Sequence, residues 1–270
     1  KKPLMKETTY EDDSLVQEPG TLEVSHVSFA YPGGEKIYED FNLSATPGQI
    51  IGVTGAVACG KSTLGKTFLC EYPYEGRICF HGKALSGMTK AEQNGMVGYL
   101  GHDPELFNDS VRNNILLGDD DDAEKYLKEV CFDGEVAEME EGMDTIVGNG
   151  GVRLSGGQAQ RLALARTLCH KRPVLILDDP FSALDRKTEE EVFANLRKFT
   201  ADSIVILLSH RLYMFPQMDQ VLWIEDGKVT AGTHEQILEK FPEYARLYEA
   251  QADGADAHNT QEGGPDHAEK

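Results

Sequence analysis

The chain is short of long apolar runs, positive charge and paired cysteines, and each shortage excludes a class of protein. No apolar run approaches the ~20 residues that a membrane-spanning helix needs. The longest, at 174–177 and 204–208, have the length of a β-strand. Residues 1–3 are not followed by the apolar segment of a signal peptide. We therefore expect neither a membrane helix nor a signal peptide here, and the absence of a starting Met suggests a piece of a longer polypeptide.

Positive charge is scarce: 26 Lys and Arg face 46 Asp and Glu, which gives a formal net charge of −20. Such a surface repels phosphate backbones and anionic lipid headgroups, so the composition argues against nucleic-acid partners and membrane-surface binding. It is compatible with a local positive pocket for a nucleotide. The 5 cysteines form an odd set without paired spacing, which is typical of a reducing compartment rather than a disulfide framework.

Composition along the chain divides it into three parts. Residues 1–20 are polar and acidic and are predicted to be a linker. Residues 21–251 alternate strand-like and helix-like segments and are predicted to form one globular domain. Residues 252–270 are rich in Ala, Asp, Gly, Glu and His, and we expect a disordered acidic tail whose histidines form no metal site. No internal repeat is visible.

Hydrophobic patterning predicts an α/β fold. The segments 174–178 and 203–208 are apolar throughout, as in parallel strands covered on both faces, whereas 22–29 and 36–43 alternate as in an antiparallel sheet. A helix is expected over 186–198 with Asp185 as its N-cap, and residues 85–170 are mainly helical in pattern. We predict a parallel-sheet core, an antiparallel β subdomain and a helical subdomain. The expected strands are 22–29, 36–43, 49–54, 76–81, 96–100, 173–178, 203–208 and 220–225.

A phosphate-binding loop, Gly55–Ser62, has the pattern G-x-x-x-x-G-K-S between an apolar strand and a helical stretch. The backbone N–H groups of such a loop surround phosphates, and the following helix points its positive end at them. Lys61 supplies a positive charge, and Ser62 offers its hydroxyl to Mg²⁺. The pattern therefore predicts a nucleotide site with Mg²⁺ as cofactor.

Two residues of this loop are unusual. Ala58 stands where nucleotide-binding loops usually carry Gly, and a positive φ there would add strain of ~1 kcal/mol. Cys59 lies just before the predicted helix start, a place where the pKa of a thiol can be lowered. Cys59 is then either a reactive group, whose alkylation blocks ATP binding, or inert filler.

A second set of chemical groups lies further along. The apolar strand ends at Asp178, which can hold Mg²⁺ through water, and Asp179, which would face the attacking water. Ser155 opens a helix whose first N–H groups, at residues 156–158, form an anion site. That helix start cannot serve the chain's own phosphate loop if both lie at opposite ends of the domain. A second chain facing it head-to-tail would satisfy both.

In combination these motifs resemble the nucleotide-binding domain of an ATP-binding cassette (ABC) transporter, over about residues 21–250. The resemblance implies the ABC ATPase fold, with ATP and Mg²⁺ as cofactors. It makes Gly55–Ser62 the Walker A loop, Val174–Asp178 the Walker B strand, Leu154–Gln158 the signature, Ser182–Asp185 the D-loop and His210 the switch histidine.

The resemblance also assigns individual residues. Tyr31 matches the aromatic residue that stacks on adenine, a contact worth roughly 1–3 kcal/mol. It assigns catalytic roles to Asp179, His210 and Lys61, and makes Asp185 the D-loop carboxylate. It assigns Ser62, Asp178 and His102 to the metal, although imidazole is a poor Mg²⁺ ligand. The residues assigned to ATP are Tyr31, Gly55, Ala58, Cys59, Gly60, Lys61, Ser62 and Thr63; the signature residues, acting in trans, are Leu154, Ser155, Gly156, Gly157 and Gln158.

Further segments resemble exporters in particular. They are Asp103–Asn108, Asn113–Ile115, Asp226–Lys228 and Gly232–Glu235. In that subfamily the membrane domain precedes this domain on the same polypeptide. The resemblance therefore implies transmembrane domains and a second nucleotide-binding domain as partners, on the cytoplasmic side of the cell membrane.

Three positions depart from the family pattern. Asp179 replaces a catalytic Glu, His102 replaces a Gln, and Asn149 replaces the Glu usual before the signature. A carboxylate misplaced by ~1 Å can cost on the order of 10²-fold in rate. One interpretation is drift in a fully active, homodimeric exporter domain. The other, which we favour, is the degenerate-site subunit of a heterodimeric exporter, with slow hydrolysis and an intact signature that serves its partner.

Two other function classes fit parts of the pattern. A soluble ABC ATPase for translation or DNA repair would carry two cassettes or a long coiled-coil insert, and neither is seen here. A P-loop kinase or small GTPase would lack the signature and the histidine at 210. Membrane segments encoded upstream of Lys1 would separate the transport function from the first of these.

Overall fold

The computed structural model describes residues 20–56, 59–148 and 150–259. In chain order its strands are β1 (Leu22–Ala30), β2 (Lys36–Ala45), β3 (Ile50–Gly55), β4 (Glu75–Phe80), β5 (Lys83–Ala84), β6 (Val97–Leu100), β7 (Asp109–Ser110), β8 (Ile146–Val147), β9 (Val174–Asp178), β10 (Ile204–Leu208), β11 (Gln220–Glu225) and β12 (Lys228–Gly232). Its α-helices are α1 (Lys61–Thr67), α2 (Lys90–Met96), α3 (Val111–Leu116), α4 (Ala123–Glu129), α5 (Asp133–Ala137), α6 (Gly156–Cys169), α7 (Arg186–Phe199), α8 (His234–Lys240) and α9 (Pro242–Asn259). Short 3₁₀ helices cover Leu85–Gly87, Gly142–Asp144 and Leu212–Gln217.

A mixed sheet of ten strands organises the described residues, in the order β5-β4-β1-β2-β12-β11-β3-β10-β9-β6. Its second half, from β11 to β6, pairs in parallel throughout. Every residue of β9 and β10 is buried, which confirms the prediction of parallel strands covered on both faces. In register, Leu208 pairs with both Asp178 and Val53, so these three strands end at one edge.

The first half of the sheet is antiparallel, as the alternating patterns predict: β1 pairs with β2 and β4, and β4 with β5. Strand β12 was not predicted. It pairs antiparallel with β11 and touches β2 in parallel, and so joins the two halves into one sheet. Its short sequence, KVTAG, is at most half-buried and lacks the apolar pattern of a core strand.

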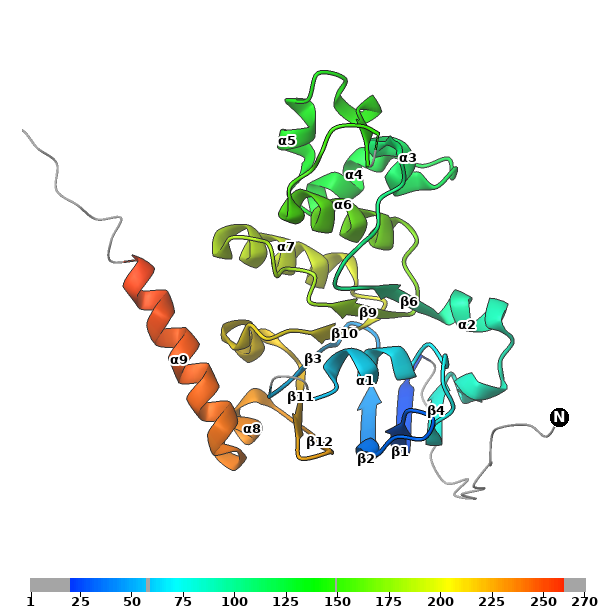
Figure 1. Cartoon of the computed structure of the whole chain (residues 1–270), viewed down its shortest axis with the longest axis vertical. Helices are drawn as coiled ribbons and strands as arrows, with labels where there is room; N and C mark the ends of the chain where they lie inside the picture. Colours follow the sequence, from blue (N-terminus) through cyan, green and yellow to red (C-terminus); the bar gives the residue numbers. More distant parts are fainter. Residues whose placement is uncertain (1–19, 57–58, 149, 260–270) are drawn as a thin grey trace, which may run out of the picture.

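The helical subdomain is a lobe made by α3 to α6, at the top of Figure 1. Its centre is α6, whose Leu162, Leu164 and Leu168 are buried. The range 85–170 predicted for this insert is too wide at its start, because β6 lies inside it and pairs with β9 in the core sheet. The strand predicted at 96–100 is confirmed as β6, and its pairing with β9 assigns it to the core sheet rather than to the helical lobe.

The ends of two helices bear on two predictions made from the sequence, the N-cap of α7 and the disordered tail. Asp185 caps α7 as predicted, because its Oδ1 accepts from the Thr188 N–H at 3.0 Å. The disordered tail predicted from residue 252 is wrong in its first part, because α9 continues to Asn259. Alanines in that stretch favour a helix once packing has started it. The predicted linker up to residue 19 and the tail from 260 lie outside the described residues.

No helix among the residues the structure describes combines the length and the apolar character that a membrane crossing requires.

The central strand β10 offers a stability test. Ile206 is 0% exposed between two parallel neighbours, so Ile206→Ala should lower the free energy of unfolding by about 2–5 kcal/mol. Ile146, 42% exposed in β8, is the matched control, and Ile146→Ala should change it by less than about 0.5 kcal/mol. Urea unfolding of both variants measures the difference. Equal unfolding midpoints would contradict the placement of the core.

Candidate nucleotide site

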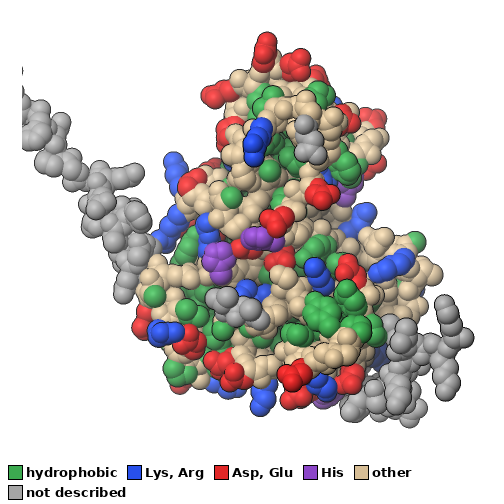
Figure 2. Space-filling view, in the orientation of Figure 1, with side chains coloured by type: hydrophobic (Ala, Val, Ile, Leu, Met, Phe, Trp, Pro, Cys, Tyr) green, Lys and Arg blue, Asp and Glu red, His purple; other side chains and the backbone are tan. Residues whose placement is uncertain are grey.

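A cavity of about 260 Å³ opens where β3, β9 and β10 end. On the face shown in Figure 2, histidine and acidic side chains lie across the middle of the molecule, between the helical lobe and the sheet. The topology thus collects groups that are far apart in sequence. The residues lining the cavity are Lys61, Ser62, His102, Asp178, Asp179, Leu208, Ser209 and His210.

The phosphate loop follows β3 and leads into α1, as its pattern predicts. Gly60 has a φ of +98°, and a Cβ there would come within 2.5 Å of Ile37. Glycine is required at that position both by the conformation and by the space. The Lys61 ammonium lies back over the loop, with Nζ 3.4 Å from the Gly55 carbonyl oxygen. Ala58 lies outside the described residues.

Cys59 corrects one expectation. Its side chain is half-buried, with Sγ 4.0 Å from the Lys61 Nζ. Burial raises the pKa of the Cys59 thiol, and the positive charge of Lys61 offsets only part of that effect. The suggestion of a lowered pKa was therefore wrong. Desolvation, which the sequence does not reveal, outweighs the nearby charge.

Asp178 ends β9 and is only 6% exposed. Its Oδ2 accepts a hydrogen bond of 3.1 Å from the hydroxyl of Tyr99, in β6. Burial, followed by the charge of Asp178, raises the pKa of Tyr99. The carboxylate of Asp178 and the hydroxyl of Ser62 line the same cavity and offer the oxygen ligands that Mg²⁺ prefers. Tyr99 was not singled out from the sequence, because only the pairing of β6 with β9 places it here.

The backbone bends sharply at Asp179, directly after the end of β9. Its φ is +52°, and its N–H donates to the Leu208 carbonyl at 2.8 Å. This bend turns its carboxylate toward two imidazoles: Oδ2 lies 2.9 Å from Nδ1 of His210 and 3.7 Å from Nδ1 of His102. The other oxygen, Oδ1, is buried and has no hydrogen-bond partner among the described residues. A buried carboxylate oxygen without a donor fits a bound water or nucleotide complex.

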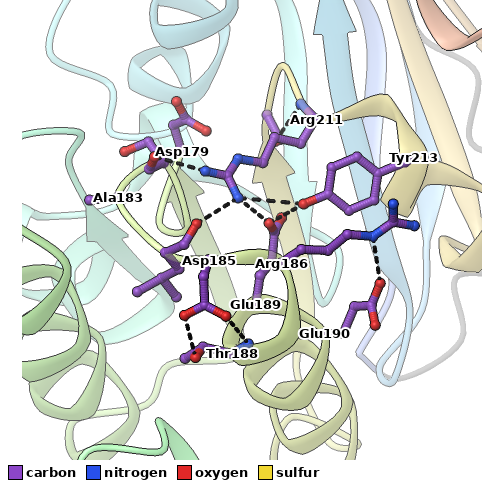
Figure 3. A network of polar contacts seen from close by, with 12 residues as sticks. Asp179, Ala183, Asp185, Arg186, Thr188, Glu189, Glu190, Arg211 and Tyr213 are labelled. Carbon is purple, nitrogen blue, oxygen red and sulfur yellow. Dashed lines mark hydrogen bonds and ion pairs between the residues drawn. The ribbon is translucent and has the colours of Figure 1, made fainter. Parts of the chain in front are cut away.

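The turn after Asp179 is held by Arg211, the residue after the switch histidine (Figure 3). Its guanidinium donates to the carbonyls of Ser182, at 2.8 Å, and Leu184, at 3.1 Å. It also pairs with Glu189, a fully buried carboxylate that accepts from the hydroxyl of Tyr213. Burial raises the pKa of Glu189, and the charge of Arg211 counteracts part of that effect. The network fixes the D-loop backbone against the loop that carries His210.

The loop that carries His210 is also held from the other side. The Gln251 side chain, in α9, donates to the His210 carbonyl at 2.8 Å and accepts from the Leu212 N–H at 2.7 Å. His210 itself keeps its ring 61% exposed toward the cavity mouth. The backbone of the loop is therefore constrained, while the imidazole, which contacts Asp179 through Nδ1, stays exposed to a ligand.

The signature forms the first turn of α6. Ser155 and Gln158 make a capping box: the Ser155 Oγ accepts from the Gln158 N–H at 3.2 Å, and the Gln158 Oε1 accepts from the Ser155 N–H at 2.8 Å. The Gln158 amide also donates to Glu135, which binds Arg161 with its other oxygen. Glu135 was not predicted, because nothing in the local sequence of α5 points to the signature.

The described lining of the cavity includes no signature residue. Leu154, Ser155, Gly156, Gly157 and Gln158 start a helix in the lobe instead, and Gly157 lies close to the D-loop, where a Cβ would come within 2.8 Å of the Ala183 oxygen. Action of the signature on a second chain's nucleotide stays a prediction.

Tyr31 belongs to an aromatic group beside α1. Its ring makes edge-to-face contacts with Phe29 and Tyr72, at centroid distances of 5.1 and 5.3 Å. Its hydroxyl lies 3.2 Å from the Thr63 Oγ1, which ties the ring to the helix after the phosphate loop. With 38% of Tyr31 exposed, an aromatic surface is open near the loop, where the adenine is expected.

Comparison with known proteins shows the family of this chain. The ABC transporter family model matches residues 38–182, more than half of the chain. A probable multidrug resistance ABC transporter ATP-binding/permease protein of Bacillus subtilis, YheI, is 35% identical over 243 residues. That match covers 87% of this chain and 42% of YheI. The ATP-dependent lipid A-core flippase of Pseudomonas fluorescens is 35% identical over 247 residues, covering 88% of this chain and 41% of the flippase.

A solved structure, of a bacterial Atm1-family ABC exporter with ATP bound, superposes with a TM-score of 0.80 at 29% identity. The match covers 90% of this chain and 44% of that one. The phosphate loop, the acid pair and the parallel sheet define a P-loop ATP-binding domain. This chain belongs to the ABC transporter family, as one of its ATPase domains, and it spans less than half the length of these relatives.

Cys59 gives a test of the site's electrostatics. Because its pKa is raised, less thiolate is present at neutral pH, so alkylation by iodoacetamide should be slow at pH 7 and should accelerate with rising pH over a range displaced upward from that of an ordinary thiol. Bound ATP should protect the thiol, and complete labelling should weaken ATP binding. Mass spectrometry of the peptide carrying Cys59 measures the rate. Fast labelling at pH 7, or undiminished ATP binding after full labelling, would contradict this account.

Proposed function

We propose that this domain binds ATP with Mg²⁺ and hydrolyses it slowly, as the motor domain of an ABC exporter. The observation that carries the proposal is the cavity in which Lys61, Ser62 and two aspartates converge, with Asp179 beside two histidines. The exporter assignment is supported by the names of the relatives, a multidrug transporter and a lipid flippase.

Each group in the cavity has a role that its chemistry suits. Lys61 neutralises phosphate charge, and the aromatic surface around Tyr31 receives the adenine. Ser62 and Asp178 would hold Mg²⁺, which supplies charge neutralisation to the phosphates when it is bound. Oδ2 of Asp179 lies 2.9 Å from Nδ1 of His210, so the two side chains bind each other directly, and the pair would orient an attacking water beside it.

Slow hydrolysis follows from the geometry of Asp179. Its carboxylate is one methylene shorter than that of glutamate, and Oδ2 is already engaged by His210. A base displaced by ~1 Å from its productive place can lose on the order of 10²-fold in rate. His102 adds a weak ligand where an amide oxygen would suit Mg²⁺ better. The site is therefore better suited to holding ATP than to cleaving it.

Dimerisation would complete the nucleotide site. The signature turn is fully capped and well formed, yet it lies outside the lining of the chain's own cavity. A second nucleotide-binding domain facing this one head-to-tail would receive the signature at its nucleotide. We infer a degenerate-site subunit paired with a competent partner, joined to transmembrane domains and placed on the cytoplasmic side of the cell membrane.

Lengthening the acid tests the slow site. Asp179→Glu should raise steady-state Mg-ATP hydrolysis by about 10- to 100-fold, because the longer side chain brings the carboxylate toward the productive place. Glutamate at a φ of +52° adds local strain of roughly 1 kcal/mol, so folding is checked by thermal unfolding. Asp202→Glu, on an exposed carboxylate, is the control and should have no effect. A fast wild type with no gain would contradict the account.

Complementation tests the signature in trans. On the Asp179→Glu background, Lys61→Ala removes the phosphate contact and Ser155→Ala removes the signature hydroxyl. Each variant alone should lose about tenfold or more in hydrolysis. Mixing the two should restore measurable turnover, because one composite site is then intact. Thr233→Ala, which removes the equivalent cap of α8, is the control for helix capping. If the mixture is no faster than its components, the signature does not act in trans.

A further inference from the structure

We propose that Tyr99 is a positioning residue that orients the Asp178 carboxylate toward Mg²⁺, an inference that rests on the proposed function. Tyr99 is the third residue of β6, the edge strand of the parallel half of the sheet, and it pairs in register with Ile176 of β9. Asp178 lies at the end of the same β9. The hydrogen bond between the two side chains, at 3.1 Å, therefore links adjacent strand ends.

The position of the phenol is fixed by its surroundings. The ring packs, partly buried, against the cluster of apolar side chains around α1 and the sheet. Its edge also lies beside Gly101, where a Cβ would stand 3.4 Å from Cε1. The backbone pairing of β6 with β9 sets where the ring starts, and this packing sets where its hydroxyl ends. Such a donor is held by the fold rather than by the ligand.

The consequence concerns the two oxygens of one carboxylate. A neutral phenol donates one hydrogen bond, here to Oδ2 of Asp178. That bond restrains rotation of the carboxylate and directs its remaining acceptor capacity toward the cavity that Ser62 also lines. Groups that orient a ligand in this way commonly change metal affinity by about 10- to 100-fold when removed.

The neighbouring histidine makes this orientation more important. His102, three residues after Tyr99, lines the same cavity, but its imidazole leans toward Asp179, with Nδ1 3.7 Å from Oδ2. Mg²⁺ prefers oxygen ligands and would take little from that ring. Asp179 and Ser209 also line the cavity, but Oδ2 of Asp179 is engaged by His210, and the Ser209 hydroxyl accepts from the Arg211 N–H. Within the described lining, Ser62 and Asp178 then remain as oxygen ligands for the metal, and the orientation of the Asp178 carboxylate matters correspondingly.

The test separates an effect on Mg²⁺ binding from an effect on nucleotide binding. Calorimetry measures the Kd of ATP in EDTA and again across a Mg²⁺ titration, for wild type and for Tyr99→Phe, which keeps the ring and removes only the hydroxyl. We expect equal affinity in EDTA and an approximately tenfold smaller gain from Mg²⁺ in the variant. Tyr126→Phe is the matched control, because it removes another tyrosine-to-aspartate hydrogen bond, to Asp121 at 2.7 Å in the helical lobe.

The outcomes distinguish the two proposals. If wild type gains no ATP affinity from Mg²⁺, the proposed function fails. If Mg²⁺ raises the ATP affinity of wild type and of Tyr99→Phe equally, the function stands and the positioning role of Tyr99 is overturned. If Tyr99→Phe also loses affinity in EDTA, its hydroxyl supports the fold of the whole site, and the specific role toward the metal is likewise overturned.

Discussion

The parallel, in-register pairing of β3, β10 and β9 is the constraint on which the rest of the structure depends. These strands are apolar and buried on both faces, so their order and register are fixed by the core. Because Leu208 aligns with both Val53 and Asp178, the phosphate loop, the two aspartates and the switch histidine emerge at one edge. A slip of one residue would separate these groups and turn each strand's side chains to the other face.

Much of this could be predicted from the sequence because the signals are local. Continuous apolar runs identified β9 and β10, and the pattern around Lys61 identified the loop. What was missed depends on contacts between distant residues. Strand β12 is a strand only because β2 and β11 flank it, Tyr99 reaches Asp178 only through pairing of β6 with β9, and burial around Cys59 reversed the expected direction of its pKa shift. Local sequence encodes none of these contacts.

The contacts in the site join Asp179, His210 and the D-loop to one another. A left-handed backbone at Asp179 turns its carboxylate to His210, and Arg211, the next residue along, binds the carbonyls of the D-loop. Gln251 holds the same loop from α9. The shape of the loop that carries His210 and Arg211 is therefore set by the D-loop and by α9 together. A change in either would reach the Asp179 carboxylate, which lines the cavity and contacts His210.

We propose that the site holds ATP well and cleaves it slowly. The most direct test is a single-turnover experiment, in which the wild-type chain is loaded with radiolabelled ATP and Mg²⁺, separated from free nucleotide and quenched over time. The account predicts that bound label is recovered mainly as ATP over many seconds. Stoichiometric binding followed by rapid conversion to ADP would contradict it, and Asp179 would then be a competent base where it stands.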